Sequence, residues 1–225
     1  MIKAAMPALV FDLDGTLVDT APDLLAALNA VLVAQGRRRV ALDALRHMVG
    51  FGARSLIRQT FEAQGTVLPD DAVKPLVNDL VAHYRAHIAD ESVPFPHVRE
   101  TLHLLASRGT RMGVLTNKPQ ELVRPLLDAL DLTRCFGAIH GAGRFDYVKP
   151  DARVFHHVVD ELGGGGGGIM IGDSATDVAT ARAANAPVIV VSYGYTPTPA
   201  HELGADAVTD DFAQIPALIE RLSLA

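Results

Sequence analysis

The sequence predicts an α/β fold in which a doubly wound, mostly parallel sheet carries an inserted α-helical cap. Three observations predict it. A short, wholly apolar run at residues 8–11 ends in the acid Asp12; only helical patterns follow, up to about residue 92; and from Val93 onward short β-rich runs alternate with helical patterns. Such alternation is typical of parallel strands joined by helical crossovers.

The first strand is expected at residues 8–11, because a strand buried on both faces of a parallel sheet reads as a continuous apolar run. Five later runs are rich in β-forming residues and are expected to be strands: 111–115, 138–140, 169–171, 188–191 and 207–208. The α/β core is therefore predicted to consist of residues 1–17 and 93–225.

The helical block begins with a helix expected from about Thr20 to Gln35. Thr20 is placed to cap it, Asp23 stands three residues later as in a capping box, and Gly36 ends it. Further helices are expected at about 42–48, 53–64 and 70–90. Because no strand is expected between them, residues 18–92 are predicted to form a cap inserted after the first strand.

Six consecutive glycines, Gly163 to Gly168, formally match the G-x-G-x-x-G pattern of dinucleotide-binding folds. That pattern must follow a strand and open a helix, whereas this run follows a predicted helix and precedes a predicted strand. We interpret it as a flexible helix-to-strand loop.

Composition excludes several classes of function. The net charge of −6 and the pI near 5.8 disfavour a nucleic-acid binder, and Arg37 to Arg39 read as a solvated turn. The single cysteine, Cys135, permits no internal disulfide. No run approaches the roughly 18 apolar residues of a membrane span. We expect a cytoplasmic protein, a monomer or homodimer, that binds neither membrane nor nucleic acid.

Polar residues follow the predicted strands at the points where those strands end. They are Asp12 and Asp14, Thr116 and Asn117, Lys149, and Asp173 and Asp177. Because the carboxyl ends of parallel strands share one edge of a sheet, these side chains are expected to converge. Carboxylates with few nitrogen or sulfur donors nearby suit Mg²⁺, and a lysine with a hydroxyl suits an anion, so the set predicts a phosphoryl site.

The residues that carry this pattern lie in four segments: Asp12 to Asp19, Val114 to Lys118, Lys149 to Asp151, and Gly172 to Asp177. In order and spacing they resemble the four motifs of the haloacid dehalogenase superfamily. The chain looks most like its phosphoglycolate phosphatase group, whose helical cap lies between the first two motifs. One departure is His97, where members of that group often have glycine.

The resemblance implies roles for these residues. Asp12 would be the nucleophile that forms an aspartyl-phosphate, and Asp14 would protonate the leaving oxygen and later activate water. Thr116 and Lys149 would hold the phosphoryl oxygens. Mg²⁺ would be bound by Asp12, Asp173 and the backbone carbonyl of Asp14.

Two of these positions have other readings. Asp177 fits a capping box with Ser174, so it is expected to cap a helix, to help hold the metal, or both. Gly15 would leave room for the phosphate or would simply suit the turn. Asn117, beside Thr116, is a candidate substrate contact.

Substrate contact by the cap is expected at Gly50 to Arg54. Two glycines before a helix free backbone N–H groups at its positive end, and Arg54 would grip a carboxylate; the alternative is a turn followed by a surface arginine. A small phosphate ester with a carboxylate, 2-phosphoglycolate, would satisfy such a loop. His83 and His87, at helical spacing, read as a solvated face.

Two other activities remain open. A sugar phosphomutase of the same superfamily shares all four motifs and would release an isomer instead of free phosphate. A phosphoacceptor signalling module also uses Asp, Thr or Ser and Lys around Mg²⁺, but it needs no cap of this length.

Overall fold

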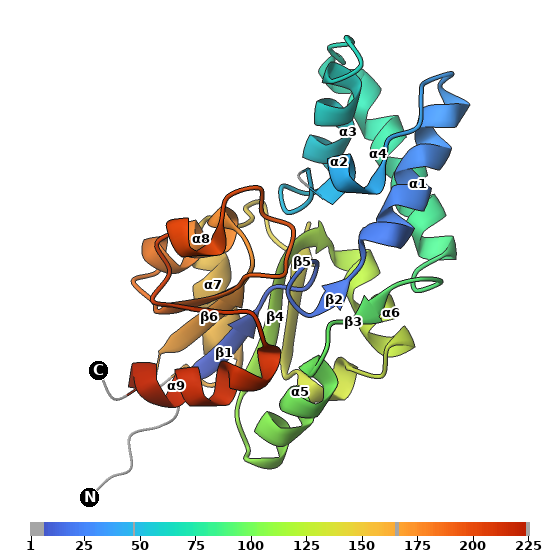
Figure 1. Ribbon diagram of the computed structural model, residues 1–225. Coiled ribbons are helices and arrows are strands. Elements are labelled where there is room, and N and C mark those ends of the chain that lie inside the picture. The colour runs from blue at the N-terminus through green and yellow to red at the C-terminus, as the bar shows by residue number, and fades with distance from the viewer. Residues whose placement is uncertain (1–6, 47, 165–166, 224–225) are drawn as a thin grey trace, which may run out of the picture.

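The computed structural model describes residues 7–46, 48–164 and 167–223, and its centre is a parallel sheet (Figure 1). Six strands lie in the order β5-β4-β1-β6-β7-β8, and every neighbouring pair is parallel. Their bounds are β1 Ala8–Phe11, β4 Met112–Pro119, β5 Ala138–Ala142, β6 Gly168–Gly172, β7 Val188–Val191 and β8 Ala207–Thr209. The predicted α/β fold class is confirmed.

Helices cover both faces of the sheet, as the alternation of side chains along β1 shows. Leu9 and Phe11 pack into a cluster with α5, α6 and α9, whereas Ala8 and Val10 pack with α7 and α8. This is why the first strand is apolar at every position. The helices are α5 Val98–Ser107, α6 Gln120–Ala129, α7 Ala152–Glu161, α8 Ala175–Ala183 and α9 Ile215–Ser223.

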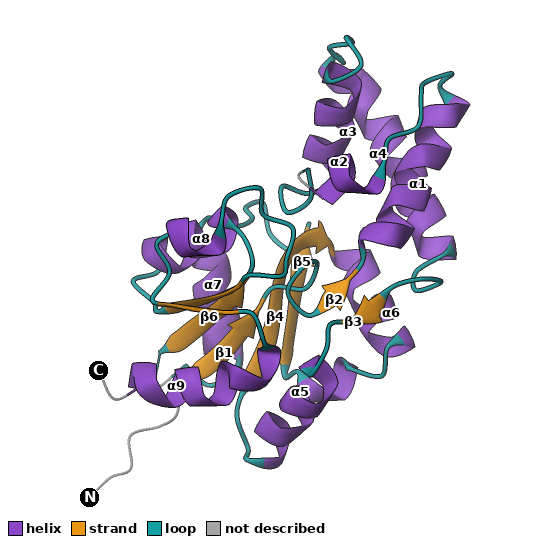
Figure 2. Cartoon of the chain, in the orientation of Figure 1, coloured by secondary structure: helices purple, strands orange, loops and turns teal. Residues whose placement is uncertain are grey.

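Four helices between β1 and β4 form a separate group beyond the carboxyl edge of the sheet (Figures 1 and 2). Their bounds are α1 Ala21–Ala34, α2 Leu42–Arg46, α3 Ala53–Glu62 and α4 Asp70–Ala86. They pack around their own apolar cluster, in which Leu28, Leu32, Ile57 and Leu80 are buried. The predicted helices are therefore present, and α4 ends four residues earlier than expected.

A two-stranded antiparallel ribbon, missed at the sequence level, joins this group to the rest. It pairs β2, Val18–Asp19, with β3, Val93–Pro94. Asp23, at the start of α1, is 2% exposed and accepts hydrogen bonds from the backbone of Glu91 and Ser92 and from the Ser92 hydroxyl. The two passages of the chain into and out of the helical group are thus held together.

The predicted cap of α1 is wrong in its hydrogen bonding. Thr20 is the N-cap residue, but its side chain does not bond to the helix. Its hydroxyl donates to Asp14 instead, at 2.7 Å, and Asp23 is taken up by the returning chain. Two tertiary contacts have therefore replaced a local motif.

The structure also describes the backbone at His97 and at the glycine run. His97, where the resemblance led us to expect glycine, lies at φ 64°, in the left-handed region that favours glycine. The glycine run connects α7 to β6 as predicted, and its last member, Gly168, is already in the strand. Residues 165 and 166 of this run lie outside the described part of the chain.

Candidate active site

The predicted residues converge where the strand order changes direction. If the six strands of this sheet are numbered 1 to 6 along the chain, their order across the sheet is 3-2-1-4-5-6. The direction of this order reverses between the first and fourth strands, β1 and β6, and such a switch point is where parallel sheets bind ligands. Asp12 directly follows β1, and Asp173 directly follows β6. Thr116 and Asn117 are in the last part of β4, on the other side of β1, and Lys149 precedes α7.

Lys149 joins two of the acids. Its ammonium group lies 3.0 Å from Asp12 Oδ1 and 2.6 Å from Asp177 Oδ1, and all three side chains are at most 6% exposed. The backbone N–H of Leu13 also donates to Asp12 Oδ1, at 2.7 Å. This nearly dry environment makes the electrostatic interactions among these groups strong.

Asp173 is held by groups from two other segments. The Thr16 hydroxyl donates to its Oδ1 at 2.9 Å, and the backbone N–H of Tyr195 donates to its Oδ2 at 2.8 Å. Two glycines make this possible: a Cβ on Gly15 would lie 2.5 Å from Asp173 Oδ2, and one on Gly194 would lie 2.2 Å from Asp173 Cβ. The space at Gly15 is thus occupied by Asp173.

The pKa values of these groups reflect burial together with mutual charge. Burial raises the pKa of Asp12 to about 7, against the attraction of Lys149 and with a contribution from Asp177. Burial, Asp177 and Asp12 raise the pKa of Asp173 well above its usual value. Burial alone would lower the pKa of Lys149, but Asp12 and Asp177 outweigh it and raise that pKa.

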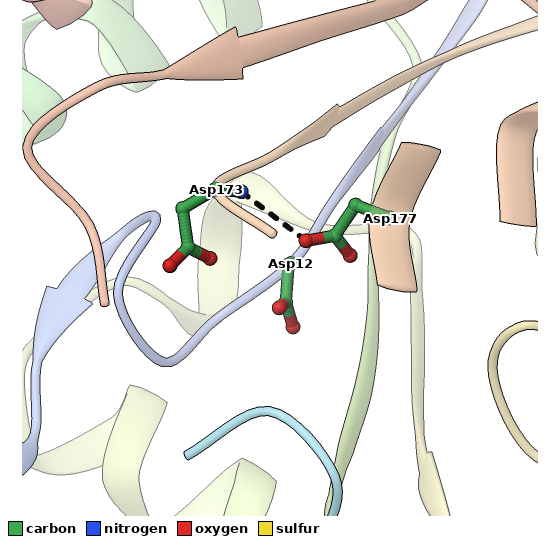
Figure 3. A group of neighbouring side chains, drawn as sticks. All are labelled: Asp12, Asp173 and Asp177. Atoms are coloured by element: carbon green, nitrogen blue, oxygen red, sulfur yellow. Dashed lines mark hydrogen bonds between the residues drawn. The ribbon is translucent and has the colours of Figure 1, made fainter. Parts of the chain in front are cut away.

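The three buried acids form a group suited to a hard cation. Oxygens of Asp12, Asp173 and Asp177 lie within 4.8 Å of one another (Figure 3). Carboxylate oxygens without sulfur or imidazole are the donors that Mg²⁺ prefers, so the residues present fit that ion. The ammonium group of Lys149, which contacts two of these acids, does not balance three carboxylates, and a divalent cation would.

Asp177 differs from the other two acids because both of its oxygens already have donors. Oδ1 accepts from Lys149, and Oδ2 accepts from the backbone N–H groups of Asp173 and Ser174 and from the Ser174 hydroxyl. It also completes the predicted capping box of α8. The contacts therefore favour Asp177 as the residue that positions Lys149 and the Asp173 backbone.

Asp14 belongs to a second network, which reaches the helical group. Its Oδ1 accepts from the Thr20 hydroxyl at 2.7 Å and from Lys118 Nζ at 2.9 Å. Lys118 also donates to the Tyr84 hydroxyl at 2.9 Å, and its ammonium group lies 4.1 Å from the centre of the Tyr84 ring. Tyr84 is in α4, so an ion pair at the sheet edge is contacted by a residue of the four-helix group.

Asn117 links the loop before α3 to Lys149, the lysine that precedes α7. Its side-chain N–H groups donate to the carbonyl of Gly50 at 3.1 Å and to the carbonyl of Lys149 at 3.2 Å. Its Oδ1 is buried and has no partner among the described residues. Thr116 is 4% exposed, and its hydroxyl accepts from the N–H of Lys118 at 3.2 Å.

Two adjoining cavities share Asp14, Val49 and Gly50 in their walls. The first lies between the sheet edge and the four-helix group, and Asp12, Thr116, Asn117 and Lys118 line it with the apolar residues of α3 and α4. The second opens over Asp173, Ser174 and Tyr195. The predicted catalytic residues Asp12, Asp14 and Thr116 thus border one cavity, while Lys149 lines neither of the two and contacts Asp12 at 3.0 Å.

The structure does not bring Arg54 to either cavity. Its side chain is 56% exposed and pairs with the exposed Asp70 at 3.4 Å. It is the second residue of α3, and its side chain turns toward the start of α4. By contrast Gly50 and Gly52, which precede α3, line the first cavity. In this arrangement Arg54 is not among the residues that line these two cavities, and its contact with a substrate carboxylate stays a prediction.

A comparison with known proteins decides the family. A model of the haloacid dehalogenase-like hydrolases matches residues 9–191. The chain belongs to this hydrolase family. Its relatives include the phosphoglycolate phosphatases of Agrobacterium fabrum, 45% identical over 96% of this chain and 94% of that protein, and of Caulobacter vibrioides, 44% identical over 92% and 88%.

Solved structures of the family have the same fold. The crystal structure of a predicted phosphoglycolate phosphatase from Haemophilus somnus superposes with a TM-score of 0.86, at 26% identity, and covers 97% of this hydrolase and 99% of that chain.

None of the helices in the described parts of the chain is long and apolar enough to cross a membrane.

Several contacts of this hydrolase's site were not anticipated. Lys118 and Thr16 stand inside two of the four motif segments but were given no role, although a lysine next to Thr116-Asn117 was a visible signal. Tyr84 and Tyr195 carry no such signal, because their positions depend on how α4 and the loop after β7 pack against the sheet.

Proposed function

We propose that this hydrolase is a Mg²⁺-dependent phosphatase that transfers the phosphoryl group of a small ester to Asp12. The observation that carries the proposal is that Asp12 belongs to a buried group of three acids and has the Lys149 ammonium group 3.0 Å from one of its oxygens. The four motif segments and the names of the relatives support it.

In this proposal the residues divide the work. An oxygen of Asp12 attacks phosphorus, the bond to the leaving oxygen breaks, and Asp14 gives that oxygen its proton. Asp14 then takes a proton from a water molecule, which attacks the phosphorus and releases Asp12 and free phosphate. Lys149 and the Thr116 hydroxyl hold the phosphoryl oxygens.

Asp12, Asp173 and the Asp14 carbonyl would hold Mg²⁺. Asp177 would position Lys149 and the Asp173 backbone beside the ion. When bound, the ion would neutralise charge on the phosphoryl oxygens and keep the neighbouring carboxylates ionised. Asp14 occupies a place that suits its role, because it borders both cavities and lies two residues from Asp12.

Residues 18–92 would act as the cap that encloses the leaving group. The first cavity supports the division into core and cap, because residues that follow β1 and residues of β4 line it together with residues of α3 and α4. The substrate we propose is 2-phosphoglycolate, and the names of the relatives, phosphoglycolate phosphatases, support it. We also propose that the reaction takes place in the cytoplasm. The monomer or homodimer state stays a prediction.

The test is release of inorganic phosphate from a panel of phosphate esters. We expect turnover with Mg²⁺ and none in excess EDTA, with 2-phosphoglycolate giving the highest kcat/KM. Calcium should substitute poorly, because it favours larger and less regular coordination. Undiminished turnover in EDTA would refute the metal site, and an isomerised ester without free phosphate would indicate a mutase.

A further inference from the structure

The leaving-group side of the first cavity contains an arrangement of positive charge to which neither the motifs nor the relatives' names assign a role. Among the described residues that line this cavity, Lys118 alone has a cationic side chain. Its side chain is 3% exposed, and most of the surrounding wall is apolar: Leu24, Val49, Leu56, Leu80 and Leu122 all contribute.

The N-terminus of α3 faces the same space. Gly52 and Ala53, where the helix begins, both line the cavity. A Cβ on Gly52 would lie 3.3 Å from the backbone carbonyl of Asn117, the residue before Lys118. Among the described residues no side chain caps this helix, and its first turn contains no acid. The N–H groups of this first turn therefore present partial positive charge to the cavity that Lys118 also lines.

From these two features we infer that Lys118 and the N-terminus of α3 together bind an anionic group on the leaving-group side of the substrate, a carboxylate in the case of 2-phosphoglycolate. The inference rests on the phosphatase function proposed above and replaces Arg54 as the reader of that carboxylate. A buried ammonium group beside helix N–H groups is a receptor for a small anion, because both supply donors away from competing water.

The existing contacts of Lys118 keep it in place for this task. Tyr84 holds it from the cap and Asp14 from the core, so its ammonium group lies at the junction of the two. An ammonium group has three N–H donors. Two are used by Tyr84 and Asp14, and the third has no partner in the described parts of the chain, so it is available to a carboxylate in the cavity.

The experiment compares two esters that differ only in the carboxylate: 2-phosphoglycolate and ethyl phosphate. The measured quantity is the ratio of their kcat/KM values. Removing Lys118 also disturbs Asp14, but that disturbance slows both esters and cancels in the ratio. In Lys118→Met the preference for 2-phosphoglycolate should fall roughly 10- to 100-fold, as for the loss of one charged hydrogen bond.

Two controls separate this effect from general damage. Lys74→Met makes the same substitution at an exposed position of α4 and should leave the ratio unchanged. At the helix end, Ala53→Glu and Ala53→Gln differ only in charge. The glutamate should lower the preference for the carboxylated ester about 5- to 10-fold relative to the glutamine, because it places a like charge at the receptor.

A binding measurement adds a readout that needs no turnover. Inhibition by 3-phosphonopropionate, which retains the carboxylate, should weaken in Lys118→Met, while inhibition by propylphosphonate should change much less. A preference that survives in both Lys118→Met and Ala53→Glu overturns the inference. So does a wild-type enzyme that hydrolyses both esters equally well, although the phosphatase proposal then stands. An enzyme that hydrolyses neither ester but releases phosphate from other esters refutes the inference and 2-phosphoglycolate as substrate, while the phosphatase activity stands; one that hydrolyses no ester refutes both.

Discussion

The buried acid Asp23 helps to hold together the two passages of the chain into and out of the four-helix group, and replacing it by asparagine should destabilise the protein strongly. Asp23 accepts from the N–H of Glu91 at 3.0 Å, from the N–H of Ser92 at 2.8 Å and from the Ser92 hydroxyl at 2.6 Å. The variant keeps the volume of the side chain. It removes the charge and replaces one of the two acceptor oxygens by an amide N–H₂ group, so the remaining oxygen accepts only as a neutral group.

The size of the effect follows from the number of donors. A hydrogen bond to a charged group stabilises by ~1.5–3 kcal/mol and a neutral one by ~0.5–1.5 kcal/mol, a difference of about 1 kcal/mol per bond. With two N–H groups and one hydroxyl affected, the free energy of unfolding should fall by about 3 kcal/mol. For a chain of this length that corresponds to a loss of roughly 6–12 °C in Tm.

Urea unfolding followed by far-ultraviolet circular dichroism measures the change. Asp79→Asn, the same substitution at an exposed position of α4, should stay within about 0.5 kcal/mol of wild type. A double-mutant cycle with Ser92→Ala should show coupling between the two positions. A loss below about 1 kcal/mol for Asp23→Asn, or no coupling to Ser92, would refute this account of Asp23.

Two further predictions follow from the geometry. Gly194→Ala should raise the Mg²⁺ concentration needed for half-maximal activity about 10- to 100-fold, because its Cβ would lie 2.2 Å from Asp173 Cβ; an unchanged metal titration would contradict the packing. The hydrogen bond to Asp211 raises the pKa of His97, so NMR titration should show a lower His97 pKa in Asp211→Asn. The stabilisation from this pair is present below the ordinary histidine pKa and is lost as pH rises through the raised one. An unaltered titration would contradict the pair.

The sequence predicts much of this fold because its elements are locally marked. The run at 8–11 is apolar at every position, since both faces of the central strand are covered, and the acids after the strands stand where the topology brings strand ends together. Gly36 ends the chain's first helix region as expected, and Ser174 with Asp177 forms the expected capping box.

What the sequence does not reveal depends on contacts between distant segments. Thr20 and Asp23 have the pattern of a capping box, yet Asp14 and Ser92 compete successfully for them. Arg54 has the right chemistry for a carboxylate, but its position on α3 directs it to Asp70. Lys118 becomes a candidate for binding the substrate's anionic group only when the structure shows that residues of α3 and α4 line the same cavity and that Tyr84 of α4 contacts it. Such choices require knowing how the cap sits on the sheet.

The central claim, phosphoryl transfer to Asp12, is tested most directly by trapping the covalent intermediate. Asp14→Asn should still accept a phosphoryl group from an aryl phosphate, whose leaving group needs little protonation, but should hydrolyse the intermediate slowly because the base is missing. Acid-quenched Asp14→Asn, digested and analysed by mass spectrometry, should carry the phosphoryl group on Asp12 after a burst of phenol near one equivalent, and Asp12→Asn should carry none. A phosphoryl group on another residue, or steady turnover without a burst, would contradict the account.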